Sequence, residues 1–406
     1  MKPAILWCSS LLGCLSILCS SLNAQSGVQF KPRSGRPAVP QQGAQQSPQA
    51  VSQDLLAVYE RTRSATDEAA LTAIARACSK VIPDQKRSIT DREYASNLFA
   101  WALNRRGELR NERAATLVEQ GQLDQASSLD QLAAKDFETA IEYNPNNWRM
   151  HHNLAIALAM KGAYVRAIQE FSSAIDLNTE YPNSYFNRAE LYFELAQYSQ
   201  AMDDYTHAIA LDGSDPQYFN SRGHCRFMTE LYEDAVDDYI RATELAIDSA
   251  AYATDLADAY QYLGRWEQAT AAYRQAVAIN SKYPRAYQNA AWLMATCPNP
   301  KFRNVELAMS AAKKVIELSG ERSSQTLDTL AAATAASGRH REAADLQQQA
   351  VQLASREDQP EMSQRLELYQ AGKNYVQPAA SNTIASQSSS IGSRIRTASG
   401  SSRPAR

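Results

Sequence analysis

Few residues in this sequence have the types and spacing that catalysis needs. His151 and His152 are adjacent, and adjacent residues on a helix point in different directions. No two of the five histidines lie four residues apart, and we find no phosphate-binding glycine loop, HExxH motif or GxSxG motif. We therefore expect a non-catalytic protein with no metal site and no cofactor.

Two pairs of acids and one cysteine complete the reactive candidates. Asp203-Asp204 and Asp237-Asp238 recur at a spacing of 34 residues, and we interpret them as the solvated face of a helix rather than as acid/base pairs. No histidine and aspartate are placed to activate Cys297 as a nucleophile, so we interpret it as a loop or packing residue. Cys78, Cys225 and Cys297 are far apart in the sequence and do not form a disulfide framework.

A row of amides and aromatics is more informative, because its members recur at the same spacing. Asn153, Asn187 and Asn289 occupy equivalent positions. Asparagine and glutamine each offer donors and an acceptor, so such a row can pair with the backbone of an extended peptide while aromatics contact its side chains. The candidate partner-binding residues are Arg149, His152, Asn153, Asn183, Phe186, Asn187, Glu190, Asn220, His224, Asp258, Arg285, Gln288, Asn289 and Trp292. The alternative is that these asparagines cap helices, stack or face water, and bind nothing.

Helical hairpins with a period of about 34 residues must position this row. Two amphipathic helices begin and end within each unit, and the units start at Trp148, Pro182, Pro216 and Ala250. Small residues (Ala155, Ala189, Gly223, Ala257) let paired helices approach closely. The packing columns are Ala167, Ala201, Ala235 and Ala269; Phe171, Tyr205, Tyr239 and Tyr273; Ala174, Ala208, Ala242 and Ala276; and Tyr164, Tyr198, Tyr232 and Trp266.

These columns resemble the tetratricopeptide repeat family, most closely over residues 148–283. The resemblance implies an all-α fold, a right-handed superhelical solenoid of antiparallel helix pairs whose first helices line a concave groove. The candidate residues stated above would lie in that groove. Their asparagines look like the ladder that holds substrate backbone in protein O-linked N-acetylglucosamine transferases, but Ser221 and Asp255 interrupt it. The carboxylate clamp of chaperone-binding members is not reproduced, since His152 and Phe186 stand where that clamp needs Lys or Asn.

One unit departs from the period, and the ends of the array diverge from it. The turn "TCPNPKFRN" (296–304) is about five residues longer than the period allows and looks like a variant known from exported bacterial members of the family. Terminal repeats are expected to be atypical because one face meets water. We predict the following divisions: signal peptide 1–24, flexible Gln/Pro-rich linker 25–50, divergent and elongated hairpins 51–147, four regular repeats 148–283, variant repeat 284–323, final repeat 324–357, capping helix 358–376, and a disordered Ser/Arg-rich tail 377–406.

The charge is unevenly distributed along the chain. No acidic residue precedes Asp54 or follows Glu367. Eight of the 41 basic residues lie in the two ends (1–50 and 377–406). The remaining 33 basic and all 44 acidic residues lie between them, so residues 51–376 have a net charge of −11. The basic ends would make weak contacts with anionic polymers or, alternatively, serve only as solvated tails. No aromatic residue lies among the arginines of the C-terminal tail, so no specific nucleic-acid site is indicated.

The first residues indicate export. Lys2 precedes an apolar stretch, and Ala24-Gln25 offers a cleavage point. Two alternatives stay open: lipidation of Cys14, or a retained N-terminal membrane anchor. We therefore expect a periplasmic or secreted scaffold that binds a protein or peptide in its groove and helps to assemble an envelope complex. The alternative function is a glycan-binding or enzyme-accessory protein of the envelope. The sequence does not determine the oligomeric state.

Overall fold

The computed structural model describes residues 51–378. Within this range every regular element is a helix, with 17 α-helices and one 3-10 helix. The predicted all-α class is therefore confirmed. The predicted signal peptide and linker (1–50) and residues 379–406 of the predicted tail lie outside the described residues.

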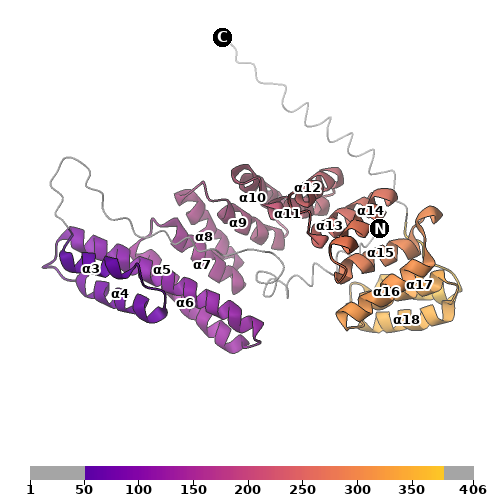
Figure 1. Ribbon diagram of the computed structural model, residues 1–406, viewed down its shortest axis with the longest axis horizontal. Helices are drawn as coiled ribbons and strands as arrows, with labels where there is room; N and C mark the ends of the chain where they lie inside the picture. The colour runs from indigo at the N-terminus through magenta and orange to yellow at the C-terminus, as the bar shows by residue number, and fades with distance from the viewer. Residues whose placement is uncertain (1–50, 379–406) are drawn as a thin grey trace, which may run out of the picture. The chain divides into compact units, whose positions relative to one another are not determined.

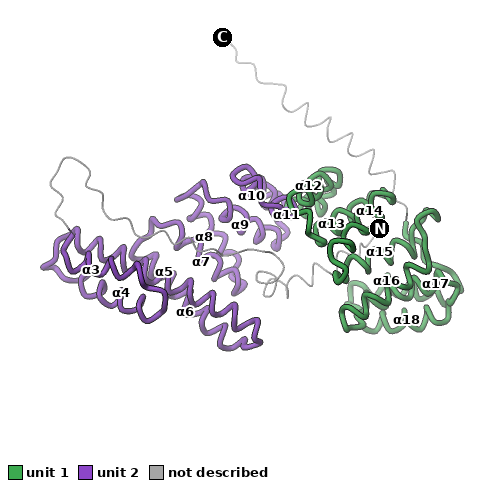
Figure 2. Tube along the Cα trace, in the orientation of Figure 1, with its two compact units in different colours: residues 1–12, 222–406 green, residues 13–221 purple. Residues whose placement is uncertain are grey.

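The chain divides after Ser221 into two compact units, shown in different colours in Figure 2. We call residues 51–221 the N-terminal unit and residues 222–378 the C-terminal unit. The N-terminal unit contains α3 (Gln53–Arg61), α4 (Glu68–Val81), α5 (Ile89–Glu119), α6 (Leu123–Tyr143), α7 (Trp148–Met160), α8 (Tyr164–Leu177), α9 (Pro182–Glu194) and α10 (Tyr198–Leu211). Helix α11 (Pro216–Met228) carries residues of both units.

The C-terminal unit continues the same alternation of helices (Figure 1). It contains α12 (Tyr232–Leu245), α13 (Ala250–Tyr262), α14 (Trp266–Ile279), α15 (Pro284–Thr296), η1 (Pro300–Phe302), α16 (Val305–Ser319), α17 (Ser324–Ala336), α18 (His340–Leu353) and α19 (Gln359–Gln370). The enlarged turn after α15 holds η1, and Asn304 at its end caps α16 by accepting from the Leu307 N–H at 3.0 Å.

Consecutive helices pair, and the first helices of successive pairs also touch. In the N-terminal unit α5 contacts α7 and α7 contacts α9; in the C-terminal unit α13 contacts α15 and α15 contacts α17. The first helices thus form a continuous face in each unit. The alanine and aromatic columns lie inside the pairs: Ala235 and Tyr239, for example, are fully buried. The columns are therefore packing positions, as the sequence predicted.

Two glycines show how closely the paired helices approach. A Cβ on Gly223 would lie 2.8 Å from the Tyr239 ring, and one on Gly107 of α5 would lie 2.6 Å from the Phe137 ring of α6. Both distances are below ordinary van der Waals contact. Glycine at these positions lets the aromatic ring fill the space directly against the backbone.

The turns inside the regular hairpins share one strained position. Gly162, Ala196, Glu230 and Gly264 are 34 residues apart and have φ values of 75°, 55°, 67° and 71°. This left-handed conformation is comfortable for glycine and costly for residues with a Cβ. Two of the four repeats therefore keep the turn geometry without the residue that suits it.

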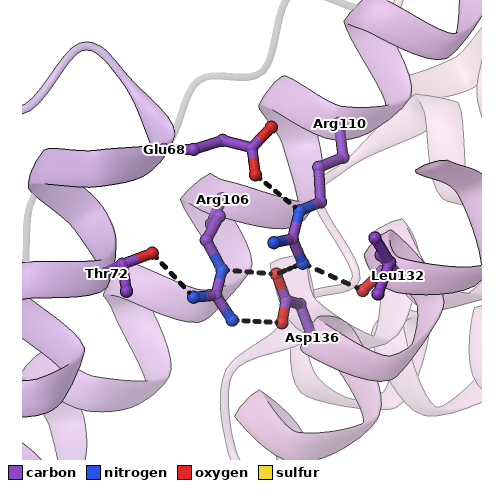
Figure 3. Close-up of polar contacts among 6 residues, drawn as sticks. All are labelled: Glu68, Thr72, Arg106, Arg110, Leu132 and Asp136. Carbon is purple, nitrogen blue, oxygen red and sulfur yellow. Dashed lines mark hydrogen bonds and ion pairs between the residues drawn. The ribbon is translucent and has the colours of Figure 1, made fainter.

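A charged cluster joins α4, α5 and α6 of the N-terminal unit (Figure 3). Asp136 of α6 accepts two hydrogen bonds from the Arg106 guanidinium, at 2.8 and 2.6 Å, and one from Arg110 at 2.7 Å. Arg106 also donates to Thr72 of α4, and Arg110 donates to Glu68. We call these residues the Asp136 cluster; each of its guanidinium groups ties α5 to both α4 and α6.

The prediction that both members of each acid pair are solvated is wrong for one member. Asp203 and Asp237 are exposed, but Asp204 and Asp238 are only 5% and 3% exposed. Arg188 donates to both carboxylate oxygens of Asp204 at 2.7 and 2.8 Å, and Arg222 does the same to Asp238 at 3.0 and 2.7 Å. An arginine sixteen residues earlier thus pairs each buried aspartate. The Arg188 and Arg222 spacing of 34 residues was the signal that could have identified these pairs.

Candidate partner-binding faces

The candidate residues of α7 and α9 all lie within the N-terminal unit and none is exposed. His152 and Phe186 are buried, whereas the other five (Arg149, Asn153, Asn183, Asn187 and Glu190) are half-buried. Their position on the first helices explains this burial, because each first helix is covered by its pair and by neighbouring first helices. Side chains here can contact a partner only with the part that the neighbours leave uncovered.

His152 is part of the packing between α7 and α9. Its Nδ1 lies 2.9 Å from the Ser184 hydroxyl, and its ring meets those of Phe171 and Tyr181 edge to face. Burial lowers the pKa of His152 to about 3, so the imidazole is neutral at physiological pH. The contacts of His152 with Ser184, Phe171 and Tyr181 all lie inside the protein.

The asparagine of the same helix connects the repeat to the elongated hairpin. Asn153 donates from Nδ2 to Asn104 Oδ1 and Glu108 Oε1 of α5, both at 3.0 Å. Glu108 is buried, which raises its pKa, and Arg105 and Asn104 stabilise its charged form. Sequence reasoning missed Asn104 and Glu108. Their four-residue spacing on an otherwise apolar-periodic stretch was the available signal.

Three of the remaining candidates of this unit, Asn183, Phe186 and Glu190, have partners on adjacent helices. Asn183 accepts a hydrogen bond from the Tyr218 hydroxyl, and Glu190 accepts one from Tyr205 at 2.6 Å. Phe186 packs against Tyr218 with ring centroids 4.9 Å apart. Arg149 lies over the Trp148 ring at 4.5 Å. Asn220, the next candidate along the chain, is buried.

The C-terminal unit presents an acidic group on its first-helix face. Arg285 of α15 bridges Asp255 and Asp258 of α13, at 2.7 Å and 2.6 Å. Asn289 donates to Asp258 at 2.8 Å, and His224 Nε2 lies 3.5 Å from Asp255. We call Asp255, Asp258 and Arg285 the acid–arginine group. The sequence placed all three on the groove face but did not predict that they pair with one another.

Burial and the shared guanidinium set the protonation of this group. Burial by itself would raise the pKa of Asp255, but Arg285 and then His224 outweigh it and lower that pKa to about 2. Burial raises the pKa of Asp258, against the opposing effect of Arg285. Two carboxylates around one arginine leave a net negative charge when both are ionised. The Arg285 side chain is 34% exposed, whereas the side chains of Asp255 and Asp258 are each only 4% exposed, so this charge lies beneath the guanidinium.

The last described residues complete the face of the C-terminal unit. Trp292 and Thr296 of α15, Gln261 of α13 and Arg365 of α19 all contact residues 373–378, which follow α19 without helical structure. We call residues 373–378 the terminal segment. Gln288 is half-buried on the same helix as Trp292. The sequence identified Trp292 as a groove position but gave no indication that residues 373–378 lie against it.

The three cysteines among residues 51–378 all lie in the interior. Cys78, Cys225 and Cys297 are free and buried, and burial raises the pKa of Cys78 to about 12 and also raises that of Cys297. Among residues 51–378 no group of three or more His, Cys, Asp or Glu side chains is arranged to hold a metal ion. The helices of that range are also all too short or too polar to cross a membrane.

Comparisons with known proteins identify the repeats. Models of the tetratricopeptide repeat match residues 111–184, 182–215 and 250–283. The chain therefore contains tetratricopeptide repeats, an architecture associated with protein–protein interaction. The match to residues 111–184 covers the end of the elongated hairpin as well as the first regular repeat. Among curated proteins, no sequence matches this chain.

Solved structures that match part of this chain include two titled as tetratricopeptide repeat proteins and one titled PilF. One from Parabacteroides merdae has 18% identity, with 65% of this chain and 98% of that chain covered and a TM-score of 0.48. YrrB, titled a TPR protein with an unusual peptide-binding site, has 20% identity, 48% and 97% coverage and a TM-score of 0.40. PilF of Pseudomonas aeruginosa has 15% identity, 53% and 93% coverage and a TM-score of 0.43.

Proposed function

We propose that this protein is a non-catalytic scaffold that binds an extended polypeptide along the first-helix face and helps to assemble an envelope complex. The observation that supports the proposal best is the terminal segment, because it is itself a non-helical stretch of polypeptide lying on that face. Its Gln377 N–H donates to the Thr296 carbonyl at 2.9 Å, and its Tyr375 ring lies 5.7 Å from that of Trp292. A partner peptide would use the same backbone acceptor and the same ring.

The acid–arginine group adds a charge preference to this face. Asp255 and Asp258 share one guanidinium, and the Arg285 side chain that pairs them is partly open to solvent. A lysine or arginine of a partner would be attracted by the remaining negative charge. We therefore expect the bound segment to carry a basic residue near the position of Arg285.

Site-specific photo-crosslinking in the native cell tests the proposal. A photoreactive residue replaces Gln288, which is half-buried on α15, and in a matched protein it replaces Arg274, which is exposed on α14. We expect discrete protein adducts from position 288 and none from position 274. Equal adducts from both positions, or none from either, would contradict binding at the first-helix face.

The same adducts show which residues hold the partner. Asn187→Ala removes an amide for which we expect contact with the peptide backbone, and the photoreactive residue stays at position 288. Asn289→Ala is less suitable because Asn289 donates to the buried Asp258, so its loss would also change stability. Adduct yield from position 288 should fall in the Asn187→Ala protein, while the melting temperature stays within about 2 °C of the parent protein, as for a surface change.

The envelope location is the remaining part of the proposal. N-terminal sequencing and mass spectrometry of the protein from fractionated cells distinguish the three predicted forms. Cleavage after Ala24 gives a chain that begins at Gln25, lipidation gives one that begins at a modified Cys14, and a retained anchor preserves Met1 or Lys2. Recovery of the full-length chain in the cytoplasmic fraction would contradict export.

A further inference from the structure

The terminal segment makes three kinds of contact with the C-terminal unit. Tyr375 packs against Trp292, the Gln377 N–H donates to the Thr296 carbonyl, and the Gln377 side chain accepts from Gln261 Nε2 at 3.3 Å. A side-chain contact between Asn374 and His340 Nε2, at 2.9 Å, holds the beginning of the segment. These contacts come from three helices, so the segment crosses the face instead of following one helix.

The end of α19 directs the chain onto this face. Gly372 has φ +70°, the Gly372 N–H donates to Tyr369 O at 3.0 Å, and the Lys373 N–H donates to Leu368 O at 2.9 Å. This pair of bonds with a left-handed glycine ends the helix and turns the chain sharply. The terminal segment therefore starts close to its contacts, with no intervening linker.

The contact for the aromatic side chain is formed by residues that the protein holds in place independently. The Arg365 guanidinium lies 5.3 Å from the Trp292 ring and 5.5 Å from the Tyr375 ring. It is fixed by Asp328, which is fully buried and accepts two hydrogen bonds from Arg365 at 2.8 and 2.9 Å. We call Trp292 and Arg365 the aromatic site. Because Asp328 and the helices hold both residues, the site does not depend on Tyr375 for its geometry.

The backbone contact also has a local cause. Thr296 is the last residue of α15, and the carbonyl groups of the last helical turn have no donor within their own helix. The Thr296 carbonyl receives the N–H of Gln377. Any extended chain that places a backbone N–H two residues after its aromatic residue can make the same bond.

We propose that the terminal segment is an intramolecular ligand of the aromatic site, and that a partner binds there by displacing it. The inference rests on the proposed function, namely that this face binds an extended polypeptide. It adds the chemistry of the partner: an extended segment with an aromatic side chain for the aromatic site and, two residues later, a backbone N–H for Thr296 and an amide for Gln261. The site is therefore occupied until such a partner is present.

Tethering makes this occupation effective even though the contacts are few. A segment attached through a short connection has an effective concentration of about 1 mM at its site. A peptide in solution at micromolar concentration competes poorly with it. Weakening the tethered segment should therefore increase the apparent affinity of an added peptide by about tenfold or more.

The experiment uses the full chain and a synthetic peptide with the sequence of residues 371–378, Ala-Gly-Lys-Asn-Tyr-Val-Gln-Pro, labelled with fluorescein. Fluorescence anisotropy measures its binding to the parent protein and to Tyr375→Ala. We expect weak binding to the parent and an apparent Kd at least about tenfold lower for Tyr375→Ala. Val376→Ala is the matched control, because the Val376 side chain is 44% exposed, and it should bind the peptide as the parent does.

Two further proteins test the site itself. Adding Trp292→Ala to Tyr375→Ala should abolish the gain in affinity. Gln377→Pro removes the backbone donor without altering Tyr375 and should give an intermediate gain. A peptide with alanine in place of its tyrosine should bind none of these proteins, and circular dichroism confirms that each variant is folded.

The outcomes separate this inference from the proposed function. Equal peptide affinity for the parent and for Tyr375→Ala would overturn the inference that the terminal segment is an intramolecular ligand. The photo-crosslinking at position 288 would still test partner binding independently. Absence of peptide binding to every variant would also overturn it, since the segment would then have no affinity for the site. A Tyr375-dependent dimer in sedimentation would place the segment on a second copy and overturn the intramolecular assignment.

Discussion

The two ends of the helical array each bury a carboxylate with arginine, but the surroundings of the two pairs differ. In the Asp136 cluster, the donors of Arg106 and Arg110 reach α4 and α6. At the other end Arg365 is held by Asp328, and the same guanidinium lies over the rings of Trp292 and Tyr375. The first pair fixes helices to one another. The second also provides a flat cationic surface for an aromatic side chain.

The comparison shows that a buried ion pair can contribute to a binding site through the other groups that contact its guanidinium. A guanidinium has donors in its plane and two flat faces. Thr72, Glu68 and Asp136 use the in-plane donors of the Asp136 cluster. Asp328 accepts hydrogen bonds from two in-plane donors of Arg365, and the guanidinium carbon also lies 5.3 and 5.5 Å from the centroids of two rings, one of which belongs to the terminal segment. Four predictions test how far the two ends, and the two units that contain them, differ.

The largest effect is expected from breaking the fully buried pair. Asp328→Ala leaves Arg365, which is only 8% exposed, without its carboxylate and should lower the free energy of unfolding by about 3–5 kcal/mol. Asp136→Ala should cost less, about 1–3 kcal/mol, because Arg110 keeps Glu68 and both arginines border solvent. Urea denaturation followed by circular dichroism measures both.

Glu361→Ala is the matched control for that comparison. Glu361 lies 3.9 Å from Arg365 and its side chain is 37% exposed, so its loss should change stability by less than about 1 kcal/mol. If Asp136→Ala were as costly as Asp328→Ala, the two clusters would not differ in the way their burial indicates.

The second effect concerns the close helix contacts, one in each unit. Gly107→Ala and Gly223→Ala should each destabilise the protein by about 1–3 kcal/mol, because the added methyl group meets Phe137 or Tyr239. Thermal denaturation checks this. Gly213→Ala is the control, since its nearest contact is 3.5 Å away. Adding Phe137→Leu to Gly107→Ala should recover part of the loss, and no recovery would mean that the ring is not the cause.

The third prediction is that the two units respond to pH with opposite signs. Glu170, 2.7 Å from His151 Nδ1, raises the pKa of His151 above 6.5 in the folded N-terminal unit. The stabilisation is complete below pH 6.5 and disappears as the pH rises through the folded pKa. It should amount to about 1 kcal/mol or less. For Asp255 in the C-terminal unit, the folded pKa of about 2 lies below 3.8, so its stabilisation is present above pH 3.8 and disappears toward pH 2.

Hydrogen exchange resolved by peptide measures the response of the N-terminal unit. Between pH 6 and pH 8.5, after correction for intrinsic exchange, α7 and α8 should lose protection in the parent protein. They should lose less in His151→Gln. A loss of equal size in both proteins would exclude His151 as the titrating group.

The smallest effect, with the opposite sign, is expected at the strained turns. Ala196→Gly in the N-terminal unit and Glu230→Gly in the C-terminal unit remove a Cβ from a left-handed residue and should stabilise by about 0.5–1 kcal/mol each. Gly162→Ala should destabilise by a similar amount. Differential scanning calorimetry detects the change as a shift in melting temperature, and a lower melting temperature for both glycine variants would contradict strain.

Much of the fold could be predicted because its causes are local and repeated. An alanine and, four residues later, an aromatic residue recur in every unit, as Ala235 and Tyr239 do, and this spacing indicates one buried helix face. The helices α7, α9, α11 and α13 begin at the first residues of the predicted units. The candidate face followed from the same register. The pairing of its residues did not: Asn153 bonds to α5, and Asp255 shares Arg285 with Asp258.

The sequence by itself therefore determined the helices and their packing columns, because periodicity records burial one turn at a time. Tertiary structure decided which polar groups meet. Asp204 and Asp238 are buried because an arginine of the paired helix reaches them, and Gln377 meets Gln261 across 116 residues of chain. No local pattern encodes the contact between Gln377 and Gln261, since it depends on how the stacked helices bring distant residues together.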